Sequence, residues 1–365
     1  MRKGKKSPAQ APGDGPGPTA ANGPRRAVTL RDVAREAGVS PATASRVLNG
    51  SIRNVRDANA ARVRAAAAKL NYEPHMSAQA IARGSTATVA LVVRGIDDPY
   101  FSSIAAGTVQ RAEQAGLIVT MAVADRSPER ELEIVRTLRG QRPRSIILAG
   151  SRIAGNGIRE TLVEELAAYR EVGGSVVVIS QHDLPFSTVS VDNSGGAERL
   201  ARALTGLGYR RFGILRAHTS LRTSQDRYEG FVAGLRQAGA RLDEQWVIEA
   251  DFTRAGGYAA ARGLVERDIA GLELVFAVND VMAIGAMTAF REAGMTPGRD
   301  IAVAGFDDIA AALDVTPALT TVAVPMHDVG RTAMDLALSG DDASTVRHVT
   351  ADVALRESTP RIRRP

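Results

Sequence analysis

The chain has 365 residues, of which 44% are hydrophobic and 4% aromatic, and its formal net charge is +6. It contains no cysteine, which excludes disulfides and thiolate metal sites, and no run of residues approaches the roughly 20 apolar positions of a membrane span. Residues 1–86 hold 15 Lys and Arg against 5 Asp and Glu, whereas the rest of the chain carries a net charge of −4, so the basic end is expected to bind a polyanion.

Residues 1–26 are dominated by Pro, Gly and Ala. They start with basic residues but lack the apolar segment of a signal peptide, so we expect a disordered basic tail rather than an export signal.

Residues 27–74 have the pattern of three short helices. Thr29 is placed to cap the first helix, and Gly38 is placed to end it in the left-handed conformation. Ser40 is placed to cap a second helix with Pro41 in its first turn, and a third helix is expected over about 57–70. Two short helices around a Gly-containing turn are typical of a helix-turn-helix, whose second helix enters the DNA major groove. A purely structural helical hairpin is the alternative, and the basic charge of this end argues against it.

From about residue 87 strands and helices alternate, after a linker of weak helical capacity. The strands are expected over 88–95, 117–124, 145–150, 175–181, 212–217, 245–250, 274–279 and 301–308, and the helices over 102–115, 128–139, 193–207, 226–238, 256–267 and 280–293. This alternation predicts parallel sheets with helices on both faces, and two groups of strands favour a two-lobed α/β body.

The stretch VTLRDVAREAGVSPATASRVLNG resembles the N-terminal signature of the lactose-repressor/galactose-repressor (LacI/GalR) family of bacterial transcriptional regulators. The resemblance continues through AARVRAAAAKLNYEP, GFDD and TPALTTV, and covers nearly all of residues 28–358. It implies an α/β fold with a small all-α headpiece and a two-lobed body of parallel sheets like that of periplasmic binding proteins. The implied parts are a helix-turn-helix domain over 27–74, a hinge helix over 75–86, an effector-binding and dimerisation body over 87–358, and a tail over 359–365. Within the body, the upper lobe is expected at about 87–191 and 323–345, and the lower lobe at about 192–322 and 346–358.

The resemblance also assigns DNA contacts. Arg46 is the best candidate for reading a base edge, because a guanidinium group can bond guanine bidentately. Serine and threonine side chains are more plausible anchors on phosphates, and Pro41 and Ala42 offer only apolar contact. The expected DNA-contacting residues are Thr29, Ser40, Pro41, Ala42, Thr43, Ser45, Arg46, Asn49 and Asn54, with Ile81 in the hinge. Ile81 matches an apolar residue that opens the central minor groove, and the alternative is that it packs on Ala78 or its symmetry mate.

The body is expected to be a small-molecule receptor with its cleft at the carboxyl ends of the strands. The resemblance places these effector-binding residues: Tyr100, Phe101, Arg227, Phe252, Asn279 and Asp307. Tyr100 and Phe101 are equally compatible with the core, and Asp307 with a helix cap. An arginine, a carboxylate and an amide suit the vicinal hydroxyls of a sugar, and an aromatic ring suits its apolar face. Where the family usually has an aspartate after the fourth strand, this chain has Ser180-Gln181-His182.

Catalytic motifs are missing: the sequence contains no P-loop, no GxGxxG opening a helix, no HExxH and no GxSxG, and its five histidines lack metal-ligand spacing. We therefore expect no catalytic residue, no metal and no cofactor.

We interpret the chain as a cytoplasmic, nucleoid-associated repressor of carbohydrate uptake or catabolism genes. It is expected to be a homodimer that binds a pseudo-palindromic double-stranded DNA operator, with no membrane association, under allosteric control by a sugar-like effector. Two alternatives stay open: a regulator that responds to a purine or another non-sugar effector, and a solute-binding receptor without DNA function.

Overall fold

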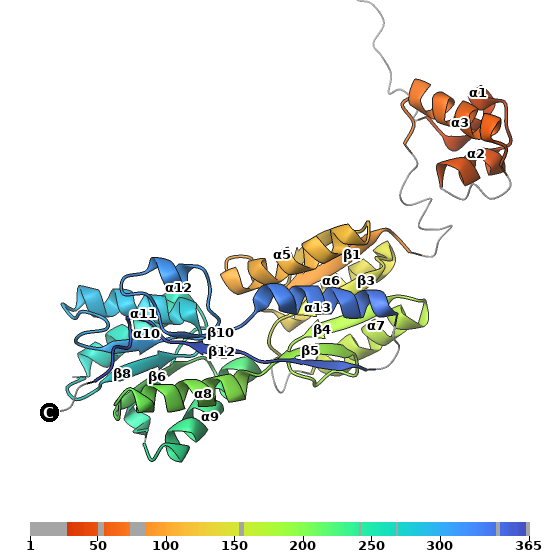
Figure 1. Ribbon diagram of the computed structural model, residues 1–365. Helices are drawn as coiled ribbons and strands as arrows, with labels where there is room; N and C mark the ends of the chain where they lie inside the picture. The colour runs from red at the N-terminus through yellow and green to blue at the C-terminus, as the bar shows by residue number, and fades with distance from the viewer. Residues whose placement is uncertain are drawn as a thin grey trace, which may run out of the picture. The chain divides into compact units, whose positions relative to one another are not determined.

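The structure is a computed structural model that describes residues 28–49, 55–73, 85–152, 157–240, 242–267, 269–340 and 344–362. The chain divides into two compact units, a headpiece within residues 1–79 and a body within residues 80–365. Figure 1 labels the elements of each. Within the described ranges, no helix combines the length and the apolar character needed to cross a membrane.

The headpiece consists of three helices, α1 (Leu30–Ala37), α2 (Pro41–Leu48) and α3 (Asp57–Lys69). Small side chains such as Ala34 and Ala44 are fully buried between them, with Val33 and Val63 at the centre of this core. The expected ends are confirmed. Ser40 Oγ accepts a hydrogen bond from the N–H of Thr43 at 3.1 Å, and Gly38 ends α1 with a φ of 60°.

Arg62 of α3 also ties the carboxyl end of α1, because its Nη2 donates to the carbonyls of Ala37 and Gly38. A cation at this end satisfies free carbonyls and opposes the negative end of the helix dipole. We expect Arg62→Ala to destabilise the headpiece by about 1 kcal/mol. Hydrogen exchange should therefore be faster in the α1 amides by roughly fivefold. Arg64→Ala removes an exposed arginine of the same helix and should leave the exchange unchanged; equal exchange in both variants would contradict this role of Arg62.

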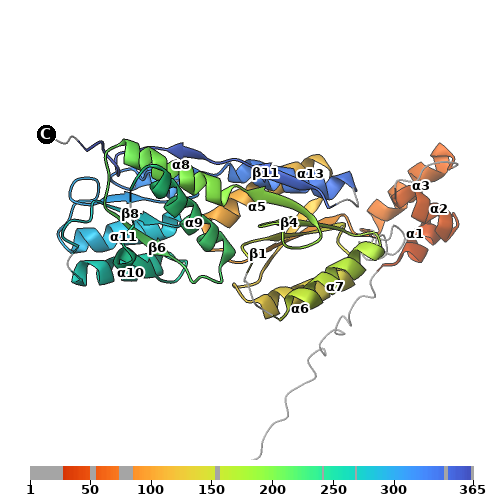
Figure 2. The same cartoon turned by 90° about the horizontal axis from the view of Figure 1, so that it is seen from below.

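The first lobe of the body is a parallel sheet between two pairs of helices. The sheet order is β11-β5-β4-β3-β1-β2. Its strands are β1 (Thr88–Val93), β2 (Ile118–Val123), β3 (Ser145–Ala149), β4 (Ser175–Ile179), β5 (Ser187–Val191) and β11 (Val346–Val349). Helices α5 (Pro99–Gln114) and α13 (Met326–Ser339) pack on one face, and α6 (Pro128–Gln141) and α7 (Arg159–Glu171) on the other, as Figure 2 shows. β3 is buried along its whole length, as expected for a parallel strand covered on both faces.

Helices α5 and α13 come from distant parts of the sequence and cross in close contact. A Cβ atom on Gly107 would overlap the carbonyl of His327, and one on Gly330 would overlap the carbonyl of Ile104. The two glycines therefore allow the backbones to approach, and the contact fixes α13 on the first lobe.

The second lobe repeats the pattern with the sheet order β7-β6-β8-β9. Its strands are β6 (Phe212–Arg216), β7 (Val247–Glu249), which follows a 3-10 turn (Glu244–Trp246), β8 (Leu274–Ala277) and β9 (Ala302–Ala304). Helices α8 (Asn193–Gly206) and α9 (Arg222–Gln237) pack together, as do α10 (Arg254–Glu266) and α11 (Asp280–Glu292), and Figures 1 and 2 show the two pairs on opposite sides of the sheet. A short helix α12 (Ala311–Asp314) precedes β10 (Thr321–Ala323), which pairs antiparallel with β12 (Asp352–Ala354).

All eight expected strands and the six expected helices of the body are present, and the expected fold class is confirmed. One expected boundary is wrong. The segment 346–358 was assigned to the lower lobe, but its first part, β11, pairs in parallel with β5 and so belongs to the first lobe. The reason is that the chain runs from α13 along the open edge of the first sheet before β12 reaches β10. Strand β5 was not expected, because its sequence STVSV is short and half polar.

Candidate functional site: a cavity between the lobes and an exposed helix of the headpiece

A cavity of about 460 Å³ lies between the two lobes of the body. The strand register explains the position of this cavity on the first lobe. Val93 of β1 is aligned with Val123 of β2 and Ala149 of β3, so these parallel strands end together at one edge of the sheet. The residues that follow them meet the residues that follow β6, β7 and β9. The lining includes Arg94, Asp98, Tyr100, Phe101, Arg126, Ser151, Ser180, Gln181, Asn193, His218, Thr223, Arg227, Phe252, Thr253 and Asp307.

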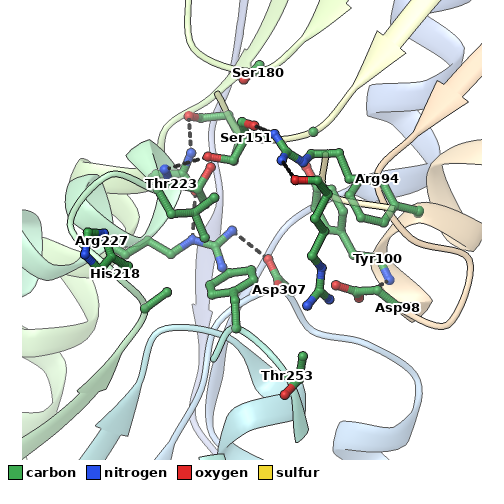
Figure 3. Close-up of a pocket in the computed structure, with 18 of the residues that line it drawn as sticks. Arg94, Asp98, Tyr100, Ser151, Ser180, His218, Thr223, Arg227, Thr253 and Asp307 are labelled. Atoms are coloured by element: carbon green, nitrogen blue, oxygen red, sulfur yellow. Dashed lines mark hydrogen bonds and ion pairs between the residues drawn. The ribbon is translucent and has the colours of Figure 1, made fainter. Parts of the chain in front are cut away.

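The centre of the second-lobe wall is a buried ion pair, shown in Figure 3. Nη2 of Arg227, on α9, lies 2.7 Å from Oδ1 of Asp307, and both residues are almost fully buried. Nε of Arg227 donates to Oδ1 of Asn193 at 2.8 Å and Nη1 to the carbonyl of Val278 at 2.7 Å, while the guanidinium lies over the ring of Phe306. Burial raises the pKa of Asp307, and the positive charge of Arg227 opposes that rise. The pair therefore presents a fixed donor and acceptor to the cavity.

The backbone of Asp307 is itself unusual. Its φ is 120° and that of Asp308 is 59°, in a region that non-glycine residues rarely adopt. Such strain persists where surrounding contacts impose it and is concentrated at functional sites. The alternative that Asp307 caps a helix is wrong, because α12 begins after Ala310.

The first-lobe wall is organised by Arg94, which directly follows β1. Its Nη1 donates to the carbonyl of Ser151 at 2.5 Å and its Nη2 to the carbonyl of Arg126 at 2.7 Å. Gly150, with a φ of 144°, has no room for a side chain because the aliphatic carbons of Arg94 lie against it. Tyr100 and Phe101 complete the wall as an edge-to-face pair with ring centroids 5.2 Å apart.

Hydrogen bonds join the two lobes across the cavity. The N–H of Thr223 donates to Oγ of Ser151 at 3.0 Å. Nε2 of Gln181 donates to Oγ1 of Thr223 at 3.1 Å and to Oδ2 of Asp226 at 2.9 Å. Gln181, in the stretch Ser180-Gln181-His182 that departs from the family pattern, therefore bridges the two lobes.

The structure brings five of the six expected effector residues to this cavity: Tyr100, Phe101, Arg227, Phe252 and Asp307. Asn279 is the exception, and its assignment is corrected. It is buried at the start of α11, where its Oδ1 accepts a hydrogen bond from the N–H of Met282 at 3.0 Å, and it is not part of the lining. Capping engages Oδ1 only, and Nδ2 of Asn279 is buried without a hydrogen-bond partner among the described residues.

Several lining residues were missed from the sequence, notably Arg94, Asp98, Arg126 and Ser151. Arg94, Arg126 and Ser151 follow strands that were correctly expected. Because ligands bind at the carboxyl ends of parallel strands, their positions in the sequence could have marked them as cavity residues. Asp98 had a local signal of its own, because an aspartate directly before proline is typical of a helix cap, and its Oδ1 accepts from the N–H of Tyr100.

In the headpiece, α2 presents the polar face expected of a recognition helix. Ser40, Pro41, Ala42 and Arg46 are exposed, and Thr29, Thr43, Ser45 and Asn49 are half-buried. Ser40 and Thr43 share a hydrogen bond between their hydroxyl groups, and Nδ2 of Asn49 donates to Oγ of Ser45. Among the residues that the structure describes, none forms an ion pair with Arg46, so its guanidinium is available. Asn54 and Ile81 lie outside the described residues.

Comparison with known proteins gives the same division. Residues 29–75 match the family of bacterial regulatory proteins called the lacI family, and residues 201–359 match a periplasmic binding protein-like domain. The chain is 32% identical to the HTH-type transcriptional regulator GalS of Salmonella typhimurium over 86% of this chain and 90% of that protein. It is 29% identical to GalR of Escherichia coli over 88% and 92%.

Solved structures extend the similarity. The lac repressor dimer bound to operator and the anti-inducer ONPF is 25% identical, with a TM-score of 0.79, over 92% of this chain and 100% of that one. The complex of the transcriptional regulator CelR with cellobiose is 28% identical, with a TM-score of 0.66, over 91% and 100%.

Proposed function

The chain belongs to the lacI family of bacterial regulatory proteins, and from this premise we propose that it is a transcriptional repressor whose operator affinity is set by a sugar-like effector in the body cavity. Its relatives are transcriptional regulators, and we give the cavity a binding role rather than a catalytic one. Residues 27–74 act as the DNA-binding domain, 75–86 as the hinge, and the body as receptor and dimerisation unit, in the cytoplasm.

The buried pair of Arg227 and Asp307 is the observation that carries the sugar assignment. A guanidinium donates hydrogen bonds and a carboxylate accepts them. Because each hydroxyl group of a sugar can both accept and donate, a guanidinium beside a carboxylate can bind two neighbouring hydroxyl groups. Phe252 lines the same cavity and offers an apolar face for the C–H side of a sugar ring. The cavity is within the size range of small-molecule sites, and a mono- or disaccharide fits that range.

The headpiece contributes specificity through α2. Arg46 contacts a guanine edge, while Ser40, Thr43 and Ser45 hold phosphates. A homodimer places two such helices on the half-sites of a pseudo-palindromic operator, as in the lac repressor dimer bound to operator.

Coupling between the sites follows from the bonds that join the lobes. An effector that contacts both walls changes the angle between the lobes. The bonds of Ser151, Gln181 and Thr223 across the cavity are satisfied only over a limited range of this angle. Because the dimer positions its headpieces through the body, that change alters operator affinity, and operator binding alters effector affinity by the same factor.

A thermal-shift screen of the purified chain tests the effector class. The panel contains mono- and disaccharides, their phosphates and acids, and purines. A ligand that binds only the folded body stabilises it by about 2.7 kcal/mol at a hundred times its Kd. We expect a shift from a carbohydrate member of the panel. A shift from a purine alone would replace the sugar assignment, and no shift from any carbohydrate would contradict it.

A further inference from the structure

The Arg126 side chain stands out on the first-lobe wall. It is half-buried and lines the cavity, yet it forms no hydrogen bond or ion pair with any residue in the described part of the chain. The other arginines nearby are engaged: Arg227 is paired with Asp307, Arg152 binds Glu131 bidentately at 3.0 and 3.1 Å, and Arg94 donates to two carbonyls. Since no hydrogen bond or ion pair engages the Arg126 guanidinium among the described residues, its donors can bind a ligand in the cavity.

The backbone holds Arg126 in place. Asp125 and Arg126 have φ values of 48° and 58°, two consecutive non-glycine residues in the left-handed region. Arg94 fixes this turn from both sides: its carbonyl accepts from the N–H of Arg126 at 3.0 Å, and its Nη2 donates to the carbonyl of Arg126 at 2.7 Å. Backbone conformations of this kind persist where surrounding contacts impose them, and they are concentrated at functional sites.

The charges around Arg126 favour an anion. Burial lowers the pKa of Arg94, Glu131 opposes this, and the positive charges of Arg152 and Arg126 lower it further, so three guanidinium groups lie close together. Asp98 lines the same wall and caps α5 through the N–H of Tyr100; burial raises the pKa of its carboxyl, and the positive charge of Arg126 opposes that rise. The two side chains form no ion pair among the described residues. Since Glu131 already binds Arg152, the described part of the first-lobe wall presents Arg94 and Arg126 against the single carboxylate of Asp98, which leaves an excess of positive charge on this wall.

We propose that the effector carries an anionic group, a phosphate or a carboxylate, and that Arg126 binds this group while Arg227 and Asp307 bind the hydroxyl groups. The planar fork of a guanidinium matches two oxygens of either anion. The effector class is then a sugar phosphate or a sugar acid instead of a neutral sugar. This inference rests on the proposed function, because it assigns a second subsite within the same cavity.

Calorimetric titration of the full-length chain with matched ligands tests the inference. Each set contains a neutral hexose or disaccharide, its phosphate ester and its uronic acid, at constant ionic strength. We expect one of the anionic members to bind roughly tenfold to a hundredfold more tightly than its neutral counterpart. The phosphate and the acid distinguish the two sources of the charge.

Variants locate the effect. Arg126→Gln should remove most of the preference for the anionic member, and Arg126→Lys should keep part of it because it retains the charge without the fork. Arg130→Gln removes an exposed arginine of α6 that pairs with Glu133, and it should leave all affinities unchanged. Unchanged thermal unfolding of Arg126→Gln shows that the variant folds.

The outcomes separate this inference from the proposed function. Tighter or equal binding of the neutral sugar would overturn the anionic subsite and leave the sugar-responsive regulator standing. An anionic preference that survives in Arg126→Gln would also overturn it. Binding of no member of any set would contradict both the subsite and the sugar assignment.

Discussion

Replacing Arg227 by alanine is expected to lower the free energy of unfolding of the body by about 3–5 kcal/mol, because it leaves the Asp307 carboxylate buried without its partner. It also removes the donors that Asn193 and the Val278 carbonyl use. Urea unfolding followed by the fluorescence of Trp246, the single tryptophan, measures the loss. We expect no binding of the effector to the variant.

The loss in Arg227→Ala should depend on pH in a defined direction. Without Arg227, burial and the negative charges of Asp280 and Asp98 all raise the folded-state pKa of Asp307 above the unfolded value of about 3.9. A carboxyl with a raised pKa destabilises the folded state as pH rises through this window, and the penalty disappears at low pH. The deficit against the wild type should therefore shrink as the pH falls from about 8 to about 5.

A matched double variant isolates the charge. Adding Asp307→Asn to Arg227→Ala replaces the carboxylate with a neutral group of the same shape, so it should restore part of the stability and abolish the pH dependence. A pH-independent deficit in the single variant, unchanged by the second substitution, would mean that Arg227 acts through packing alone.

Arg46→Ala is expected to weaken operator binding by about 1–3 kcal/mol for each headpiece, if its guanidinium reads a base edge. Fluorescence anisotropy with a labelled operator, selected by the protein itself from a random DNA pool, gives the affinity. A second selection with the variant gives its sequence preference, and a base contact predicts that the preference relaxes at one position of each half-site.

The control is Arg64→Ala, which removes an equal charge from an exposed position on α3. It should leave the preferred sequence unchanged, and if Arg64 contacts a phosphate it should lower the salt dependence of binding. A similar result for Arg46→Ala, with uniform weakening and an unaltered preference, would make Arg46 a phosphate contact.

Much of the fold was predictable because local signals agreed with one another. Gly38, Ser40 and Pro41 each indicate a helix boundary in the headpiece. In the structure, Gly38 ends α1, Ser40 caps α2 and Pro41 is the first residue of α2. The strands of the body are apolar runs separated by helices, which is the pattern of a parallel sheet. Strands β5 and β11 carry no such run, and β11 joins its sheet only through pairing with a strand distant in sequence. The hydrophobic pattern of a short polar strand does not show which strand it pairs with in the sheet.

Residues of the candidate site were predictable where they belong to a recognisable sequence motif. They were missed where only the three-dimensional arrangement brings them to the cavity. Arg227 and Asp307 stand in recognisable segments, and the structure confirms that they meet in a cavity. Arg126 belongs to no motif, and its importance depends on a left-handed turn held by Arg94, which sequence does not display. Asn279 shows the opposite error, since a residue in a recognisable segment is engaged in capping α11.

The central claim is that one ligand in the body cavity changes the affinity of the headpiece for DNA. The most direct measurement is operator affinity, by anisotropy, with and without a saturating amount of the ligand found in the thermal screen, for the wild type and for Asp307→Asn. We predict that the ligand changes the wild-type operator Kd by about 5- to 150-fold, while Asp307→Asn binds the operator normally and does not respond. An operator affinity that is indifferent to bound ligand, or a normal response in Asp307→Asn, would contradict the account.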